Sequence, residues 1–408
     1  MSALYLINIT LGVVFALCYF YQYIFLFIAY LEKPKKLPDA SAARLGILIA
    51  ARNEERVVHS LLDSLKSQDY PRELYTVFVI ADNCTDDTAK IARNLGATVY
   101  ERQNELQIGK GYAIDFLIKR IWSDFGTDYF DAFVIFDADN TLEPDFLTEI
   151  NKTFALGYDV VTSYRAASNY GENWRAAGQG MYFIRESRIM NLARMRLRAT
   201  TFVTGTGFLF SKEICKRYGG WPFHSLTEDG EFSMHNAVCG VKCGYCNSAV
   251  FYDEQATDIR DSWYQRLRWC KGGLWIFKKY MPSLARGIFS RRFFSSFDML
   301  MCLAPAYILT LLAIGVNIIA FVILALLGEN PLAMLSALLP IAVGAYILIL
   351  LFSIPLTVSE WKHLRATPQK KILYAFTFPL FLFTFIPAAL VALFKKVKWR
   401  PVSHGKKR

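Results

Sequence analysis

The sequence predicts an α/β domain placed between membrane-spanning helices at the two ends of the chain. The 408 residues are 54% hydrophobic, and their mean hydropathy of +0.24 is too high for an ordinary soluble enzyme. The apolar residues gather at the two ends, while the region between them alternates short apolar runs with helix-like stretches. The charged fraction of 20% and the aromatic fraction of 15% exclude a disordered or fibrous chain.

The first apolar segment, residues 3–31, contains no charged side chain. A helix of about 20 residues crosses the hydrocarbon core, so this segment is long enough to span a membrane. It lacks the basic start and the small-residue cleavage site of a signal peptide, which predicts a retained anchor over residues 1–33. Lys33, Lys35 and Lys36 follow the segment, so the positive-inside rule places the next region in the cytoplasm and the N-terminus outside.

The cytosolic region, residues 34–260, predicts a mainly parallel sheet whose active face lies at the carboxyl ends of the strands. The expected strands cover residues 45–51, 75–81, 97–100, 132–136 and 159–163, and the expected helices cover residues 55–67 and 85–95. The sequence contains no G-x-G-x-x-G and no G-x-x-x-x-G-K-[ST] motif. The absence of the first motif disfavours a dinucleotide-dependent dehydrogenase, and the absence of the second disfavours a P-loop nucleotidase.

Polar residues follow three of the expected strands. Asn53 and Glu54 come after the first strand, Asp82 after the second, and Asp137 and Asp139 after the fourth. Capping of the following helices is the plain alternative for any one of these sites. Because all three sites fall at one edge of the predicted sheet, we interpret them together as a binding site.

Asp137-Ala138-Asp139 predicts a site for a hard divalent cation, because two carboxylates after a buried strand can hold the ion together with nucleotide phosphates. An EF-hand loop is excluded, since Leu142 stands where that loop needs Gly and Thr148 where it needs Glu. Lys110, between two glycines, supplies a cation that could meet a phosphate.

Two later loops carry candidate functional groups. Thr204, Gly205, Thr206 and Gly207 interrupt a β-like apolar run, which indicates either a plain bulge or the close approach of another molecule. Residues 225–231 precede a predicted helix that runs through residue 238, and Ser225 with Glu228 fits a capping box. Capping does not explain Asp229, which precedes Gly230 on a loop-like edge where it could take a proton from a hydroxyl.

Gln265, Arg268 and Trp269 share one face of a predicted helix over residues 261–280, because their spacing is i, i+3 and i+4. The face offers an amide, a guanidinium suited to a diphosphate and a flat ring suited to a sugar. The alternative is an amphipathic helix on the membrane surface, and one helix can serve both purposes. We assign residues 261–299 to this interfacial part.

Three further apolar segments are long enough to span a membrane, namely residues 300–327, 332–358 and 372–394. Residues 300–394 are therefore predicted as C-terminal membrane helices, followed by a basic tail over residues 395–408. Four crossings place this tail outside, yet its basic residues favour the inside. Either the last segment, which contains Pro379 and Pro387, is re-entrant or interfacial, or another element such as residues 293–300 is miscounted.

Taken together and in this order, these motifs resemble the family-2 glycosyltransferases, and among them the membrane-embedded synthases of β-linked polysaccharides such as cellulose, hyaluronan and poly-N-acetylglucosamine. The resemblance covers residues 44–273. It implies a GT-A type nucleotide-sugar-binding domain inserted between N-terminal and C-terminal transmembrane helices. It also implies a UDP-sugar donor, Mg²⁺ or Mn²⁺, and inversion at the anomeric carbon.

The resemblance also implies roles for single residues. Asp139 looks like the metal ligand of the family's D-x-D motif, Asp229 like the general base of its T-E-D motif, and Lys110 like the basic residue of its G-K motif. Residues assigned in this way are, for the donor, Asn53, Glu54, Asp82, Lys110, Asp137, Gln265, Arg268 and Trp269; for the acceptor, Thr204, Gly205, Thr206, Gly207 and Trp269; for catalysis, Thr227, Glu228 and Asp229; and for the metal, Asp137 and Asp139. Two alanine positions depart from the family pattern, at residues 50–51 in place of a proline and at residue 81 in place of an aspartate.

The implied function is the transfer of a hexose or N-acetylhexosamine to a growing β-linked glycan chain, with extrusion through the membrane. One alternative is a single transfer to a lipid, and another is a silent membrane scaffold. We expect no nucleic-acid partner, because the net charge of +11 is placed beside the membrane segments; a partner subunit stays open.

Zinc binding by His235, Cys239, Cys243 and Cys246 is disfavoured, because a strand over residues 241–247 turns the last two thiols to opposite faces. We interpret the eight cysteines of the chain as reduced thiols.

Overall fold

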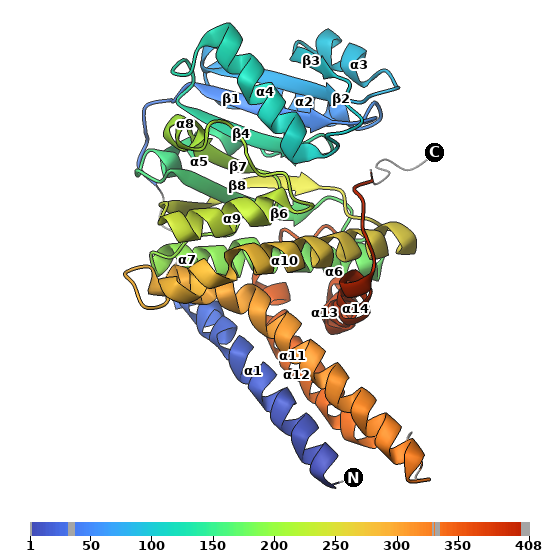
Figure 1. Ribbon diagram of the computed structural model, residues 1–408. Coiled ribbons are helices and arrows are strands. Elements are labelled where there is room, and N and C mark those ends of the chain that lie inside the picture. Colours follow the sequence, from blue (N-terminus) through green and yellow to red (C-terminus); the bar gives the residue numbers. More distant parts are fainter. Residues whose placement is uncertain (1, 32–36, 329, 331–334, 401–408) are drawn as a thin grey trace.

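The computed structural model describes residues 2–31, 37–328, 330 and 335–400, and Figure 1 shows them as three zones. An α/β domain lies at the top of the view. A layer of helices lies beneath this domain, and long apolar helices extend away from that layer.

The sheet of the α/β domain is mixed, with the strand order β3-β2-β1-β4-β7-β6-β8-β5. Its parallel half contains β1 (Leu45–Ala51), β2 (Tyr75–Asp82), β3 (Thr98–Arg102) and β4 (Ala132–Asp137). The other half contains β5 (Thr141–Leu142), β6 (Val160–Ala167), β7 (Phe208–Ser211) and β8 (Cys243–Asp253). There β6 and β8 are parallel, whereas β7 runs antiparallel to both β4 and β6. The predicted parallel strands are confirmed, and the antiparallel β7 is an addition.

Helices cover both faces of the sheet, which explains why its strands are apolar on both sides. One face carries α2 (Val58–Lys66), the short η1 (Arg72–Leu74), α3 (Thr88–Asn94) and α5 (Phe146–Phe154), and the other carries α4 (Lys110–Phe125), α8 (Lys212–Tyr218) and α9 (Glu228–Cys239). In α2, Val58, Leu61, Leu62 and Leu65 are buried at helical spacing, and each buried side chain of this kind contributes about 2 kcal/mol.

Residues 202–207 form a loop that precedes β7, so the prediction of a β-like run there is wrong. Gly205 and Gly207 have φ angles of 91° and 63°. These are left-handed values that a regular strand cannot contain.

The layer beneath the domain consists of α6 (Trp174–Ile184), the π-helical η2 (Arg185–Asn191), α7 (Leu192–Arg196) and the long α10 (Ile259–Gly287). Buried ion pairs join this layer to the apolar helices. Arg194 is 0% exposed and pairs with Glu186 and, at 2.6 Å, with Asp298, while Arg188 lies 3.2 Å from Glu360. Removing one partner of such a pair costs about 3–5 kcal/mol, so the layer and the apolar helices form one packed unit.

Four segments of the described chain are long and apolar enough to cross a membrane: Leu4–Leu31, Phe293–Leu326, Leu338–Ser359 and Pro368–Phe394. The first three correspond to α1 (Ser2–Leu31), α11 (Phe293–Leu326) and α12 (Leu335–Ser359), which run together away from the domain in Figure 1. α11 begins at Phe293 and not at residue 300, because the polar turn before it ends there. Asn8 of α1 and Asn317 of α11 exchange hydrogen bonds of 3.1 and 2.8 Å.

The fourth apolar segment is divided into α13 (Pro368–Phe383) and α14 (Phe385–Phe394). α13 packs against α6 and α12, and α14 packs against α10, so both helices lie beside the interfacial layer (Figure 1). Lys33, Lys35 and Lys36, and the end of the basic tail from residue 401, fall outside the described residues.

Candidate active site

The loops after β1 and β2 are joined by hydrogen bonds at the carboxyl edge of the sheet. Asn53, with a φ of 57°, accepts a 2.8 Å bond from the backbone N–H of Thr85, and the N–H of Glu54 donates to Thr88 Oγ1 at 2.8 Å. Asn53 and Glu54 do not cap α2, whose N-cap is Val57 without a side-chain bond. The capping alternative is therefore wrong for these two residues.

Asp82, at the end of β2, is buried and paired with Arg102 at the end of β3. The two side chains are 7% and 5% exposed, and Arg102 Nη1 lies 2.6 Å from Asp82 Oδ1. Arg102 also donates to the carbonyl of Gln107 at 2.9 Å. Arg102 was not predicted as a site residue, although a basic residue near the end of an expected strand at the active edge of the sheet indicates a partner for a carboxylate there.

Lys110 brings three predicted elements together. It is the first residue of α4, and its Nζ contacts Asp137 and donates to the carbonyl of Gly205 at 2.7 Å. The N–H of Asp137 donates to Thr206 Oγ1 at 2.9 Å. The G-K residue, the D-x-D residue and the glycine loop therefore meet at one point.

Asn140 fixes the second carboxylate of the D-x-D motif. It is fully buried, and its Nδ2 donates to Asp139 Oδ1 at 3.2 Å. Its Oδ1 accepts from the N–H of Asp137 at 3.1 Å and also contacts Thr206 Oγ1. Asn140 thus holds the turn that presents both carboxylates.

The glycine loop lies against the candidate base. A Cβ added to Gly205 would lie 3.3 Å from Asp229 Oδ2, and the φ of 91° at this position favours glycine as well. The carbonyl of Thr204 accepts a hydrogen bond from Arg165, whose Nε lies 2.9 Å from Asp253 Oδ2. Arg165 and Asp253, at the ends of β6 and β8, were not predicted as site residues.

Thr227, Glu228 and Asp229 form the start of α9, and not the loop-like edge that was expected. The capping-box alternative is wrong, because Thr227 is the N-cap and no side chain caps the helix. Among the described residues the hydroxyl of Ser225 has no hydrogen-bond partner. A Cβ on Gly272 would lie 2.3 Å from Thr227 Oγ1, so α10 packs directly on this turn.

Burial raises the pKa values of both carboxyl groups at the start of α9. The pKa of Glu228 rises to about 7, because burial and the neighbouring Asp229 both disfavour its charge, while Lys110 and Arg268 oppose the rise. Burial also raises the pKa of Asp229, against the N–H of Gly230 and the charges of Arg268 and Lys110. A pair with pKa values shifted toward neutrality is suited to proton transfer.

The predicted face of α10 is confirmed as one side of the helix, and it points at three different neighbours. Arg268 Nη1 donates to the carbonyl of Leu226 at 2.7 Å, beside the start of α9. Gln265 Oε1 accepts from Gln179 of α6 at 2.9 Å. Trp269, Tyr182 of α6 and Phe385 of α14 form one aromatic cluster, in which the ring centroids are 5.8 to 6.2 Å apart.

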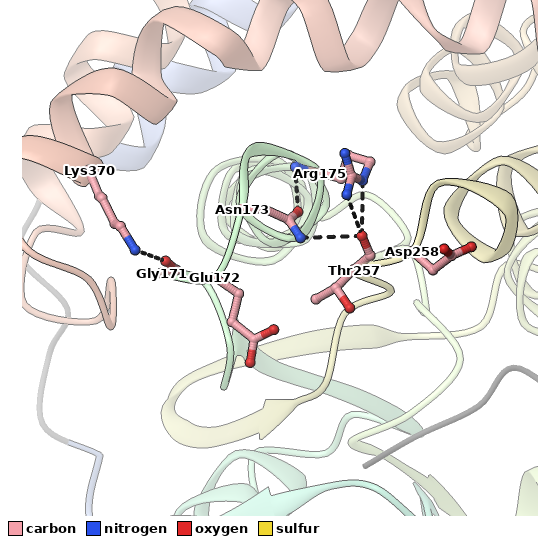
Figure 2. Close-up of a pocket in the computed structure, with 7 residues that line it drawn as sticks. All are labelled: Gly171, Glu172, Asn173, Arg175, Thr257, Asp258 and Lys370. Atoms are coloured by element: carbon pink, nitrogen blue, oxygen red, sulfur yellow. Dashed lines mark hydrogen bonds between the residues drawn. The ribbon is translucent and has the colours of Figure 1, made fainter. Parts of the chain in front are cut away.

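A polar cavity of about 700 Å³ opens where α6, α10 and α13 begin (Figure 2). Asn173 caps α6 and Asp258 caps α10, and Arg175 donates to the carbonyl of Thr257 at 2.6 and 3.0 Å. Lys370 of α13 donates to the carbonyl of Gly171 at 2.6 Å. This contact holds the start of the last apolar segment, residues 368–394, against the domain.

The described part of the C-terminal tail lies against α10 and against the loop after β1 of the α/β domain, which the sequence did not predict. Arg400 is 3.6 Å from Asp261, and Tyr264 donates to the carbonyl of Lys398. The Trp399 ring lies 5.2 Å from the guanidinium of Arg52, the residue that follows β1. In Figure 1 the tail runs from α14 toward the domain and not along the apolar helices.

Cys243 and Cys246 belong to the hydrophobic clusters on opposite faces of the sheet, as the strand alternation predicts. His235 Nε2 and Cys239 Sγ lie 3.5 Å apart on α9.

Asp137 and Asp139 fit a hard cation that a diphosphate shares. Within the described residues no group of three or more His, Cys, Asp or Glu side chains could hold a metal ion by itself. Two carboxylates on one turn leave several positions of an oxygen-coordinated ion free, which phosphate oxygens can fill.

Comparisons with known proteins agree with this geometry. The family model described as "Glycosyltransferase like family 2" matches residues 43–272. The beta-monoglucosyldiacylglycerol synthase of Nostoc sp. is 27% identical over 316 residues, which are 74% of this chain and 61% of that protein. The poly-beta-1,6-N-acetyl-D-glucosamine synthase of Staphylococcus epidermidis is 23% identical over 235 residues, 56% of this chain and 54% of that protein. The chain therefore spans less than two thirds of the length of these relatives.

A solved structure shares the fold over nearly the whole chain. The mannosyltransferase PcManGT from Pyrobaculum calidifontis, in complex with GDP-Man and Mn²⁺, has a TM-score of 0.63 and 18% sequence identity. The match covers 96% of this chain and 99% of that one, so it includes the apolar helices as well as the α/β domain.

Proposed function

Because the chain belongs to the family-2-like glycosyltransferases, whose model matches more than half of its length, we propose that it moves one hexose from a UDP-sugar to a hydroxyl group of a membrane lipid. Transfer from a nucleotide sugar follows from the family. The lipid acceptor, the UDP carrier and the residue roles below are the proposal.

The observation that carries the lipid acceptor is the contact between Trp269 and Phe385. Trp269 belongs to the α10 face beside the candidate base, and Phe385 belongs to the interrupted helical segment α13–α14. The outer side of this segment is apolar and exposed, at Ile372, Leu373, Phe376, Leu380, Ile386 and Phe394. An acceptor held at Trp269 therefore has its remaining part next to an apolar surface, which suits a lipid tail.

Extension of a polysaccharide, favoured by the sequence motifs and by the similarity to a poly-N-acetylglucosamine synthase, stays a second candidate. A translocated glycan needs polar or aromatic groups along its path through the bilayer. Among Asp, Glu, Lys, Arg and His, the sequences of α1, α11 and α12 contain a single residue, Asp298, and it is paired with Arg194. These helices do contain aromatic and polar side chains, such as Tyr19, Tyr23 and Asn317, so the preference for the lipid acceptor rests on the contact between Trp269 and Phe385.

The donor is assigned to the carboxyl edge of the sheet. We assign the nucleotide to the loops of Asn53, Glu54 and Asp82 and the diphosphate to Lys110 and Arg268, whose cations flank the first turn of α9. Asp139, with Asp137, would hold Mg²⁺ or Mn²⁺, which supplies charge neutralisation of the leaving diphosphate.

Asp229 acts as the general base in this proposal. It takes the proton of the acceptor hydroxyl, and the oxygen attacks the anomeric carbon from the side opposite the diphosphate, while the bond from this carbon to the diphosphate breaks and UDP leaves. Glu228 and Thr227 hold the first turn of α9 in place under Gly272 of α10, and the glycine loop of residues 204–207 leaves room for the acceptor beside Asp229. An α-linked donor then gives a β-linked product.

The acceptor is tested by the rate of UDP release in nanodiscs. With UDP-glucose and Mn²⁺, adding diacylglycerol to phosphatidylcholine nanodiscs is expected to raise the initial rate at least about tenfold, because the reacting hydroxyl is then held in the membrane plane. A β-linked oligosaccharide in place of diacylglycerol should give no increase. Stimulation by the oligosaccharide alone would reject the lipid acceptor, and activity with GDP-mannose alone would reject the UDP carrier.

The proposal includes a membrane topology of three crossings. We place α1, α11 and α12 across the bilayer, and α13 and α14 on the surface that faces the α/β domain. The tail up to Arg400 then lies on the cytosolic side, which removes the conflict between four crossings and the basic tail.

Protease protection in inside-out vesicles tests this topology. A tag at the C-terminus is expected to be digested together with the α/β domain, while tags at the N-terminus and at residue 330 are expected to be protected. Protection of the C-terminal tag would show that the α13–α14 segment crosses the membrane.

A further inference from the structure

A second cavity, of about 580 Å³, lies where α10 ends and α11 begins, far along α10 from Trp269. Its lining includes three arginines and three serines: Arg286, Arg291, Arg292, Ser283, Ser290 and Ser296. None of the residues that line it is acidic. In Figure 1 the turn between α10 and α11 lies at the left edge of the view, at the junction between the interfacial layer and the long helices.

None of the three arginines of this cavity lies within ion-pair distance of a carboxylate of residues 2–31, 37–328, 330 and 335–400. Arg286 donates to the carbonyl of Pro282 at 3.3 Å and to Ser283 Oγ at 3.5 Å, and Arg292 donates to the carbonyl of Val238. Nearby basic residues differ, since Arg194 pairs with Asp298 and Lys279 with Glu231. Guanidinium groups and hydroxyls that converge on one cavity match the oxygens of a phosphate.

The cavity lies at the depth of lipid headgroups in the proposed topology. α11 enters the apolar region at Phe293, and three rings beside the cavity are exposed: Phe289 by 92%, Phe293 by 42% and Phe294 by 55%. Exposed aromatic rings next to basic residues are typical of a membrane surface. The N-terminus of α11 lies at the same turn, where the positive end of the helix dipole favours an anion.

A purely structural role explains only one of the three arginines. Arg292 satisfies a carbonyl at the C-terminal end of α9, where Val238 lies, and is therefore a helix-capping residue. Within the part of the chain that the structure describes, Arg291 makes no such bond, and Arg286 contacts only the preceding turn of its own helix. These two cations are left for a ligand.

We propose that this cavity binds the phosphate headgroup of an anionic phospholipid from the leaflet that faces the α/β domain. The bound headgroup joins the ends of two helices that begin at the candidate active site. α9 extends from Glu228 and Asp229 to Val238 at the cavity, and α10 extends from Gln265 and Trp269 to Arg286. Binding is therefore expected to increase transfer activity, and this consequence rests on the proposed function.

The experiment measures lipid binding to the purified full-length protein by native mass spectrometry. Phosphatidic acid is the probe, because its headgroup has no hydroxyl group that could accept a sugar. The variant Arg286→Gln with Arg291→Gln is expected to bind it about 30-fold more weakly than the wild type, since each arginine near an anionic lipid contributes about 1 kcal/mol. The matched control is Lys66→Gln with Lys90→Gln, which removes two exposed charges from α2 and α3 and should bind like the wild type.

Three outcomes would overturn the proposal. The arginine variant could bind phosphatidic acid like the wild type, or the lysine control could lose as much affinity, which would indicate attraction by overall charge. Displacement of the lipid by excess inorganic phosphate would identify a site for a soluble anion instead.

Transfer rates in nanodiscs give the second measurement. The wild type is expected to be several-fold faster with phosphatidic acid than with phosphatidylcholine alone, and the arginine variant should keep the phosphatidylcholine rate without the increase. Equal stimulation of both proteins would contradict the proposal. Absence of product in every membrane would reject the proposed function and leave the binding result unaffected.

Discussion

Asp229→Asn is expected to lower the rate of sugar transfer by about 10³-fold or more while the protein still binds UDP. A positioned general base contributes about 10²- to 10⁴-fold to proton transfer in the transition state, and an amide cannot take the proton. Asp229 is suited to this task because it lies against the glycine loop at Gly205, with burial raising its pKa. The measurement is the initial rate of product formation at saturating donor and acceptor.

The lower transfer rate of Asp229→Asn is not expected to come from a loss of stability. Since burial raises the pKa of Asp229, the side chain stabilises the fold only while it is protonated, and this contribution is lost as the pH rises through the folded-state pKa. The Asn variant is therefore expected to unfold at the same or a higher temperature than the wild type at pH 8. A variant that keeps wild-type rates would remove Asp229 from the proton transfer.

The dependence of the transfer rate on pH tests the same pair of carboxyl groups. Wild-type activity is expected to fall as the pH decreases through about 7, because the pair of Glu228 and Asp229 takes up a proton there. Glu228→Gln removes the neighbouring negative charge, so its acidic limb should move to lower pH while transfer continues. An unmoved limb would show that the pair does not set the profile.

Asp139→Asn is expected to cause the second large loss, about 10²- to 10³-fold in transfer rate, together with weaker Mn²⁺ binding in the presence of UDP. The carboxylate would hold the ion that neutralises the leaving diphosphate, and electrostatic stabilisation of developing charge has about this magnitude. Electron paramagnetic resonance of Mn²⁺ measures the binding directly.

Asp128→Asn is the control for this substitution, because Asp128 is an exposed carboxylate whose partners are the surface residue Lys216 and the hydroxyl of the neighbouring Thr127. It should leave both the rate and the Mn²⁺ affinity unchanged. Full activity of Asp139→Asn without added metal would show that the reaction does not use this site.

The meeting of the predicted residues could be anticipated from the sequence, because the carboxyl ends of parallel strands share one edge. Lys110, Asp137, Gly205 and Asp229 come from four separate segments. Lys110 contacts Asp137 and the carbonyl of Gly205, and a Cβ added to Gly205 would lie 3.3 Å from Asp229 Oδ2. The face of α10 was predictable for a similar reason, since helical spacing alone places Gln265, Arg268 and Trp269 on one side.

The ion-pair partners in the sheet and in the helical layer beneath it could not be predicted from the sequence, because these ion pairs depend on tertiary contacts between distant segments. The pairs of Asp82 with Arg102 and of Arg165 with Asp253 join neighbouring strands whose order cannot be read from local pattern. The helical layer over residues 174–196 was missed, because its arginines resemble a basic surface stretch, whereas Arg188 and Arg194 are buried against carboxylates.

The position of the last apolar segment could not be predicted from the sequence either. Hydropathy and length favour a fourth membrane crossing at residues 368–394, but the break at Thr384 and the packing of α14 on α10 place it beside the interfacial layer. Composition measures how well a helix suits lipid, and it does not tell whether the helix crosses the bilayer or lies along it.

The chemical identity of the product shows whether the acceptor is a lipid or a growing glycan. After incubation with labelled UDP-glucose and Mn²⁺ in nanodiscs that contain diacylglycerol, mass spectrometry of the organic phase is expected to find a lipid with a single added hexose, and NMR is expected to show a β-linkage. The same product should be absent with Asp229→Asn. A water-soluble ladder of glycan lengths, with no glycosylated lipid, would contradict the account and establish the polymerising reaction instead.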